Sequence, residues 1–204
     1  AIDRNKAGLV VGTNVGRRMT GLRGEFDMPM FLRGLNDGAN PAVTPALDAA
    51  EIDRVRTALA AKVQVSSASV RQTEHAAAQE REQAFFAGNR KQPGVFATPS
   101  GLQYKILQQG KGVRPMPGQK VRVNYVGTLL DGTKFDSSYD HGQPAVFGLN
   151  DVIPGWTEGL GLMPVGAKYR FWIPSNLGYG QSGMAPTIPP DATLVFDVEL
   201  IGVQ

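Results

Sequence analysis

A run of 42 residues without glycine or proline, residues 46–87, dominates this sequence. Both residue types are frequent on either side of it. Thr44 and Pro45 are a typical helix start, because a threonine hydroxyl can cap backbone N–H groups and proline is favoured at the first helical position. Gly88 and Asn89 are a typical stop. The run therefore predicts one long helix, roughly 63 Å if it is continuous, at about 1.5 Å per residue.

The two halves of this predicted helix differ in pattern. In the first half apolar residues recur at spacings of three to five, namely Leu47, Ile52, Val55, Leu59 and Val63. Asp48 and Glu51 add negative charge near the positive end of the helix dipole. The second half is mostly alanine and polar residues, among them His75, which we interpret as a solvated surface residue. Because a helix that is polar on most sides usually bridges domains, we expect the first half to pack and the second to form a stalk.

Residues 1–43 read as short helices. Gly8, Gly12 and Gly16 are four residues apart, which places them on one helical face and allows a second backbone to approach closely. Residues 27–36 predict a second short helix. A membrane span is excluded because polar and basic residues interrupt the apolar run, and no Gly-Lys-Ser/Thr motif follows that would make a phosphate loop. So short a region cannot bury a core alone, so we expect a homodimer, with packing inside one chain as the alternative.

Composition excludes several classes of function. The net charge of +3 is spread evenly along the chain, which argues against a nucleic-acid surface. The absence of cysteine removes thiol catalysis, disulfides and cysteine-ligated zinc. No run reaches the roughly 18 apolar residues of a transmembrane helix. The first residue is Ala rather than Met, which is compatible with a mature, processed or trimmed chain.

From residue 93 onward the pattern changes to alternating apolar and polar residues. All five tyrosines and both tryptophans lie in residues 91–204. The alternating segments are GLQYKILQQG, QKVRVNYVGTLL, AKYRFWIP and TLVFDVELIG. A period of two with turn residues between the segments predicts β-strands. With one short helix expected near Pro154–Trp156, this region predicts a small antiparallel sheet and one helix, an α+β unit.

Residues 98–204 resemble an FKBP-type peptidyl-prolyl cis–trans isomerase. The resemblance rests on SGLQYKIL, VRVNYVGTLLDGTKFDSS, VIPGWTEGLGLMPVG, LGYG and IPPDATLVFDVELI, in that order and spacing. The N-terminal part is similar to the helical region of the dimeric bacterial branch, the macrophage infectivity potentiator-like (Mip-like) proteins. The resemblance implies an FKBP-like antiparallel sheet wrapped around a short helix. The expected parts are a helical dimerisation region (1–43), a long connecting helix (44–92) and a catalytic domain (93–204).

The resemblance also implies a proline-binding pocket. Its catalytic residues would be Asp136, Tyr179, Phe135 and Trp156, and its substrate-binding residues Tyr125, Phe147, Val152, Ile153, Ile188 and Phe196. In the family, the Trp156 indole would form the floor under the proline ring. The Ile153 backbone N–H would donate to a bound ligand. Where some relatives carry a further aromatic at the rim, this chain has Ala145.

The function implied is acceleration of X–Pro bond rotation in proline-containing, unfolded or partly folded polypeptides, with no cofactor and no metal. The dimer would add chaperone activity, and tacrolimus and rapamycin would occupy the pocket as inhibitors. The alternatives are a non-catalytic module that binds proline segments, and a scaffold whose helical arm is the functional part. The intact aromatic and acidic set counts against both. The resemblance favours a periplasmic, outer-membrane-associated or secreted protein of a Gram-negative bacterium, with a cytoplasmic protein as the alternative.

Overall fold

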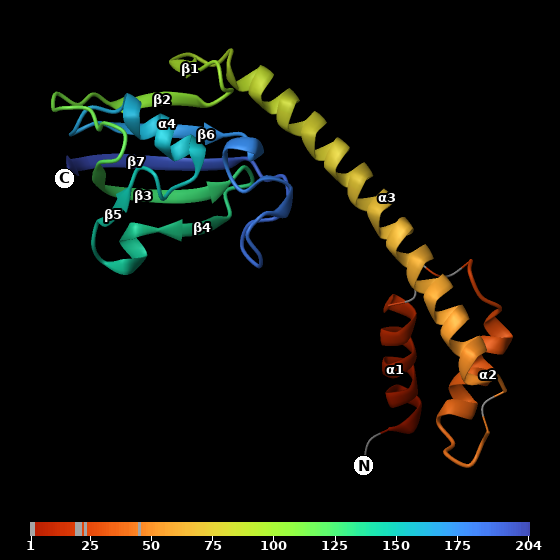
Figure 1. The fold of residues 1–204 in the computed structure, drawn as a ribbon. Helices are drawn as coiled ribbons and strands as arrows, with labels where there is room; N and C mark the ends of the chain where they lie inside the picture. Colours follow the sequence, from red (N-terminus) through yellow and green to blue (C-terminus); the bar gives the residue numbers. More distant parts are fainter. Residues whose placement is uncertain (1–2, 19–21, 23, 45) are drawn as a thin grey trace. The chain divides into compact units, whose positions relative to one another are not determined.

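The chain divides into two compact units, Ala1–Thr73 and Glu74–Gln204, of which the computed structural model describes residues 3–18, 22, 24–44 and 46–204. The first unit is helical. The second contains the end of a long helix, an antiparallel sheet and one short helix (Figure 1). The predicted α+β architecture, with helices before a C-terminal antiparallel sheet, is confirmed. Among the described residues, no helix has both the length and the apolar character that a membrane span requires.

The helices of the first unit are α1 (Arg4–Arg18), α2 (Met28–Gly38) and the first part of α3 (Ala49–Asn89). Both short helices fall where the sequence predicted them. Asp27 caps α2, and its carboxylate accepts the Met30 N–H at 2.9 Å. The rings of Phe26 and Phe31 lie 5.2 Å apart on either side of this cap. An apolar contact between these two positions fixes the angle at which the chain enters the helix.

α3 begins later than the sequence predicted. Its first residue is Ala49, and the residue before it, Asp48, accepts the Glu51 N–H at 2.8 Å. The Glu51 carboxylate accepts the Asp48 N–H in return, at 3.2 Å. This reciprocal pair satisfies two backbone donors at the start of the helix. It replaces the start predicted at Thr44 and Pro45, and Pro45 itself lies outside the described residues.

The contacts along α3 also differ from those predicted. None of its residues is fully buried; Ile52 and Leu59 of the apolar stripe are half-buried, and Leu47, Val55 and Val63 are exposed. The helix ends at Asn89, as predicted, and that end is anchored within the second unit. The buried Gln103 side chain donates to the Phe86 carbonyl at 2.9 Å and accepts from Asn89 at 2.9 Å. The second half of α3 was expected to be solvated, and this is wrong for its last turns. They contact the second unit through polar groups, which apolar periodicity does not reveal.

Seven strands of the described chain form one antiparallel sheet in the order β1-β2-β6-β7-β3-β4, with β5 pairing β3. These strands are β1 (Val95–Ala97), β2 (Gln103–Gln108), β3 (Lys120–Leu129), β4 (Lys134–Ser137), β5 (Ala145–Gly148), β6 (Lys168–Ile173) and β7 (Leu194–Val203). Alternate residues of β3 and β7 are buried, as the period of two predicted. Because β3 and β7 pair along nearly their whole length, their inward side chains form the centre of the core.

α4 (Pro154–Leu162) crosses one face of the sheet, at the position predicted for the short helix (Figure 1). Two glycines allow it to approach β6. A Cβ atom at Gly155 would lie 2.5 Å from Ile173, and one at Gly159 would lie 2.7 Å from the Phe171 ring. Because no side chain separates the helix from the strand here, the helix lies close to the sheet and its first turn is held against the core.

Candidate active site

A cavity of about 410 Å³ lies next to the first turn of α4. Its wall is mainly aromatic, with two acids. It is lined by Tyr125, Phe135, Asp136, Phe147, Asp151, Val152, Ile153, Trp156, Tyr179, Met184 and Phe196. These residues come from β3, β4, β5, β7, the start of α4 and the segment between β6 and β7. A concave apolar site with few polar groups is the usual form of a ligand pocket.

Trp156 forms the base of this cavity. Pro154 occupies the first turn of α4, so the helix begins here and directs the indole into the core, where it is 5% exposed. Three rings meet the indole edge-on: Tyr125 at 5.1 Å, Phe147 at 5.5 Å and Phe196 at 5.1 Å between centroids. The buried indole N–H has no acceptor among the described residues. Leaving such a donor unsatisfied costs about 1–3 kcal/mol. An unpaired N–H at the base of a cavity is therefore a sign of a functional site.

Phe135 and Phe196 form a second wall. Their rings are perpendicular, with centroids 5.4 Å apart. They lie over Gly127 of β3, where a Cβ atom would be 2.7 Å from both rings. The strand therefore has to carry glycine at this position for the two rings to meet across it.

Asp136 is held in place by two donors. The Tyr125 hydroxyl donates to its Oδ2 atom at 2.6 Å, and the Ser137 N–H donates to Oδ1 at 2.8 Å. His141 Nε2 lies 3.7 Å from the same Oδ1 atom. The carboxylate is therefore fixed at the edge of the aromatic cavity, with its position set by β3 and β4.

The two tyrosines of the cavity remain protonated. Burial, followed by the hydrogen bond to Asp136 and the charge of that carboxylate, raises the pKa of Tyr125. Burial and the charge of Asp136 also raise the pKa of Tyr179. Since an ordinary tyrosine titrates near pH 10, both hydroxyls are hydrogen-bond donors throughout the physiological range. The site thus offers donors and one anchored carboxylate, without a paired acid and base.

Nine of the ten residues predicted for the site line this cavity. The exception is Ile188, which is 1% exposed in the core and is absent from the lining. It forms a β-bridge with Met184, which does line the cavity and which the sequence reasoning missed, as it missed Asp151. Met184 lies five residues after Tyr179 in the same segment, but no sequence pattern marked it as a residue of the site. Ala145, expected at the rim, is half-buried against the core.

The two histidines have different surroundings. His141 is exposed, as predicted, although it lies near Asp136. His75 was interpreted as a solvated surface residue, and this is wrong: its side chain is 24% exposed and its Nδ1 atom lies 2.8 Å from Asp191. In the described part of the chain, no three His, Asp or Glu side chains are grouped as metal ligands.

Comparison with known proteins gives a consistent result for both units. Residues 111–201 match the family described as FKBP-type peptidyl-prolyl cis-trans isomerase, and residues 4–106 match the domain amino terminal to it. The chain is 41% identical to the FKBP-type peptidyl-prolyl cis-trans isomerase FkpA of Aeromonas hydrophila, over 98% of this chain and 76% of that protein. It is 34% identical to the outer membrane protein MIP of Legionella longbeachae, over 99% and 86% respectively. The crystal structure of FkpA from Escherichia coli matches with a TM-score of 0.76 and 36% identity, covering 100% of this chain and 97% of that one.

Proposed function

This chain belongs to the FKBP-type peptidyl-prolyl cis-trans isomerases, and we propose that the cavity above Trp156 is the place where it turns the X–Pro bond. The enzyme acts on proline-containing polypeptides. In our proposal the proline ring rests on the indole, between Tyr125, Phe135 and Phe196. The observation that carries the proposal is the group of three rings around Trp156, with the anchored Asp136 at its edge.

The reaction requires no covalent intermediate. Rotation about the X–Pro bond breaks amide resonance, and the intrinsic barrier is about 18–20 kcal/mol. The planar amide is more dipolar than the twisted one, so an aromatic cavity with little water disfavours the ground state relative to the transition state. A million-fold acceleration requires about 8 kcal/mol. Binding the proline ring, removing water and contacting the twisted amide together supply a contribution of this size.

The polar groups of the cavity take separate roles. Asp136, held by Tyr125 and Ser137, faces the amide group as it twists and stabilises that geometry. Tyr179 is a protonated donor beside it, suited to the substrate carbonyl. Ile153 lines the cavity, and its N–H donates to no acceptor in the described chain, which leaves it available to a ligand. Val152 and Phe147 complete the apolar wall, and Ile188 supports Met184 from the core.

The test is the rate of cis–trans exchange of a short X–Pro peptide, followed by NMR. We expect Asp136→Ala to lower kcat/KM at least about tenfold, as loss of a group that acts in the transition state does. Asp140→Ala is the matched control, because Asp140 is an exposed acid four residues away that pairs with Lys134 instead. Rapamycin or tacrolimus should abolish the exchange by filling the cavity. A chain that binds rapamycin but gives no acceleration would instead be a proline-binding module.

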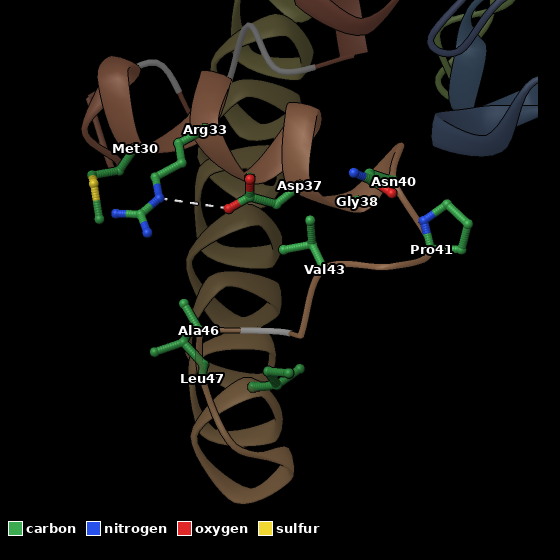
Figure 2. A pocket seen from close by; sticks show the side chains of 11 residues that line it. Met30, Arg33, Asp37, Gly38, Asn40, Pro41, Val43, Ala46 and Leu47 are labelled. Carbon is green, nitrogen blue, oxygen red and sulfur yellow. Dashed lines mark ion pairs between the residues drawn. The ribbon is translucent and has the colours of Figure 1, made fainter.

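We also propose that the first unit dimerises. Its apolar side chains lie on the surface of the single chain, with Leu9 71% and Met30 62% exposed. A groove of about 580 Å³ with a largely apolar lining runs between α2 and α3, past Met30, Val43 and Leu47 (Figure 2). Burying such surfaces against a second copy is favourable at about 25 cal/mol per Å². Sedimentation as a monomer at micromolar concentration would contradict the proposal.

A dimer with two proline-binding cavities could hold an unfolded client at two points, so we propose a chaperone activity for it. The test is suppression of aggregation of a denatured protein, compared between the unaltered chain and Asp136→Ala. Equal protection by the two proteins would show that the chaperone activity does not depend on isomerisation.

We further propose export to the periplasm or outer membrane of a Gram-negative bacterium, supported by the Legionella relative that is named as an outer membrane protein. Cell fractionation tests this against the cytoplasmic alternative.

A further inference from the structure

The segment between β6 and β7, residues 174–193, carries two of the cavity's side chains, Tyr179 and Met184. It has little regular structure beyond two short 3₁₀ turns and one bridge. Within the segment, the Asp191 N–H donates to the Gly180 carbonyl at 2.9 Å. Its other internal backbone bonds close short local turns or the bridge between Met184 and Ile188, so the position of the segment as a whole also depends on contacts outside it.

Glu82 of α3 contacts both ends of this segment. Its Oε1 atom accepts the Ser175 N–H at 2.6 Å and the Thr193 hydroxyl at 2.9 Å. Its Oε2 atom accepts the Ser175 hydroxyl at 3.1 Å. Both partners are buried, and bonds to a carboxylate are stronger than bonds between neutral groups. One side chain therefore joins the point where the segment leaves β6 to the point where it enters β7.

His75 contacts the same segment at two further residues, Gln181 and Asp191. It lies seven residues before Glu82, which places the two side chains on one face of α3, two turns apart. Its Nδ1 atom is 2.8 Å from Asp191 Oδ1, and its Nε2 atom is 2.8 Å from the Gln181 amide nitrogen. The imidazole ring therefore lies between Asp191 and Gln181, although Nδ1 makes no hydrogen bond of good geometry to any described residue. The Asp191 side chain is only 8% exposed, and the imidazole lies directly against it.

We propose that Glu82 and His75 are positioning residues for the isomerisation, because they hold the segment that presents Tyr179 and Met184 to the substrate. The last turns of α3 would then belong to the active site. The end of α3 is itself fixed to the sheet, because the Gln103 side chain of β2 hydrogen-bonds to the Phe86 carbonyl and to the Asn89 side chain. This inference rests on the proposed function of the cavity.

The proposal predicts a particular kinetic signature. When the segment leaves its position, the cavity is complete in only a fraction of molecules, and the apparent affinity falls by that fraction. Substrate at saturation draws the population back to the complete form, so kcat changes little. Loss of Asp136, in contrast, lowers kcat.

The experiment uses the full chain with Glu82→Ala, Glu82→Gln, His75→Ala and the control Glu80→Ala, an exposed acid on the same helix. We expect Glu82→Ala to raise KM about fivefold with kcat within about twofold, as partial population of the complete cavity requires. Glu82→Gln should restore KM, because an amide oxygen can accept the Ser175 N–H and the Thr193 hydroxyl. His75→Ala should raise KM less, and Glu80→Ala should leave it unchanged.

Amide hydrogen exchange gives a second readout that does not depend on activity. Glu82→Ala should accelerate exchange in residues 175–193 at least about tenfold, while amides of β3 and β7 stay protected. Unchanged exchange or unchanged KM in Glu82→Ala would overturn the proposal. So would a loss of protection throughout the sheet that glutamine does not rescue, because Glu82 would then be merely structural. If the unaltered chain failed to accelerate peptide exchange, the proposed function would fail, and the positioning role for that reaction would fall with it. The hydrogen-exchange result would then still decide whether Glu82 orders the segment.

Discussion

In the unit that spans residues 74–204, large apolar side chains such as Phe171 and Ile173 are wholly enclosed. In the unit that spans residues 3–73, comparable side chains lie on the surface, among them Leu9, Val11 and Leu32. The two regions have similar kinds of apolar residue but different means of covering them. A sheet of paired strands with a helix on one face makes its own interior, whereas the helices of the first unit leave these apolar side chains uncovered within the single chain.

The glycines of the two units show the same contrast. Gly155 and Gly159 lie where any side chain would collide with β6, so their partner is already present in the same chain. Gly8, Gly12 and Gly16 of α1 have nothing within 4 Å of the position a Cβ atom would take. A row of small residues on one helical face, facing open space, is the arrangement expected of a surface awaiting a second helix. We call residues 74–204 the closed unit, because its apolar side chains and close-packed glycines are covered within the same chain. Those of the first unit are not.

Removing a core side chain tests the closed unit. Phe171→Ala should lower its free energy of unfolding by about 3–5 kcal/mol, because a ring is lost from an interior that cannot collapse fully. Leu9→Ala should leave that value unchanged and weaken association instead. Urea unfolding followed by tryptophan fluorescence measures the closed unit selectively, because Trp156 and Trp172 both lie in it. Equal destabilisation by the two substitutions would contradict the division into independent units.

Substituting matched glycines is the next test. Gly159→Ala should cost about 1–3 kcal/mol by overpacking α4 against Phe171. Gly12→Ala should stabilise a monomeric α1 by about 0.5–1 kcal/mol, because alanine is the better helix former. If the glycine face meets a second copy, the same methyl group should weaken the dimer in sedimentation experiments. A dimer unaffected by Gly12→Ala would place the contact elsewhere.

Tyrosine ionisation at alkaline pH should affect the second unit, since the first unit contains no tyrosine. Tyr125 holds its proton more tightly in the folded than in the unfolded chain, because burial and Asp136 raise its pKa. Below about pH 10 both states are protonated, so the stability is fully present; above it the unfolded tyrosine ionises first and the stability falls. Tyr125→Phe should reduce this slope, and Tyr179 and Tyr169, whose pKa values burial also raises, should contribute to the slope that remains. Tyr139→Phe, at an exposed tyrosine, should leave it unaltered.

The smallest effect is expected at the exposed edge of the cavity. His141 lies 3.7 Å from Asp136 Oδ1, but its side chain is 71% exposed. Water and salt weaken so exposed a pair, so His141→Ala should change kcat/KM less than about twofold. Peptide exchange at low and high salt measures this. A tenfold loss would show that His141 takes part in the reaction.

Much of the secondary structure of residues 74–204 could be predicted, because strands and helix starts are marked by residues that lie close together in the sequence. Alternating burial in β3 and β7 appears as a period of two in the sequence, and Pro154 marks the first turn of α4. The resemblance identified the residues of the cavity, and nine of the ten predicted residues line it, Trp156 among them. Ile188 lies in the core instead, and its bridge partner Met184 lines the cavity.

The sequence by itself determined the element types and the end of α3 at Asn89, since each depends on residues close together in the chain. Tertiary structure alone decided what the last turns of α3 do. Glu82 and His75 look like solvated polar residues in a polar helix. Their partners are distant: Ser175 is 93 residues away from Glu82, and Thr193 is 111 residues away from it. Apolar periodicity records which residues avoid water, but it carries no information about which polar residues will find a buried partner after the chain has folded.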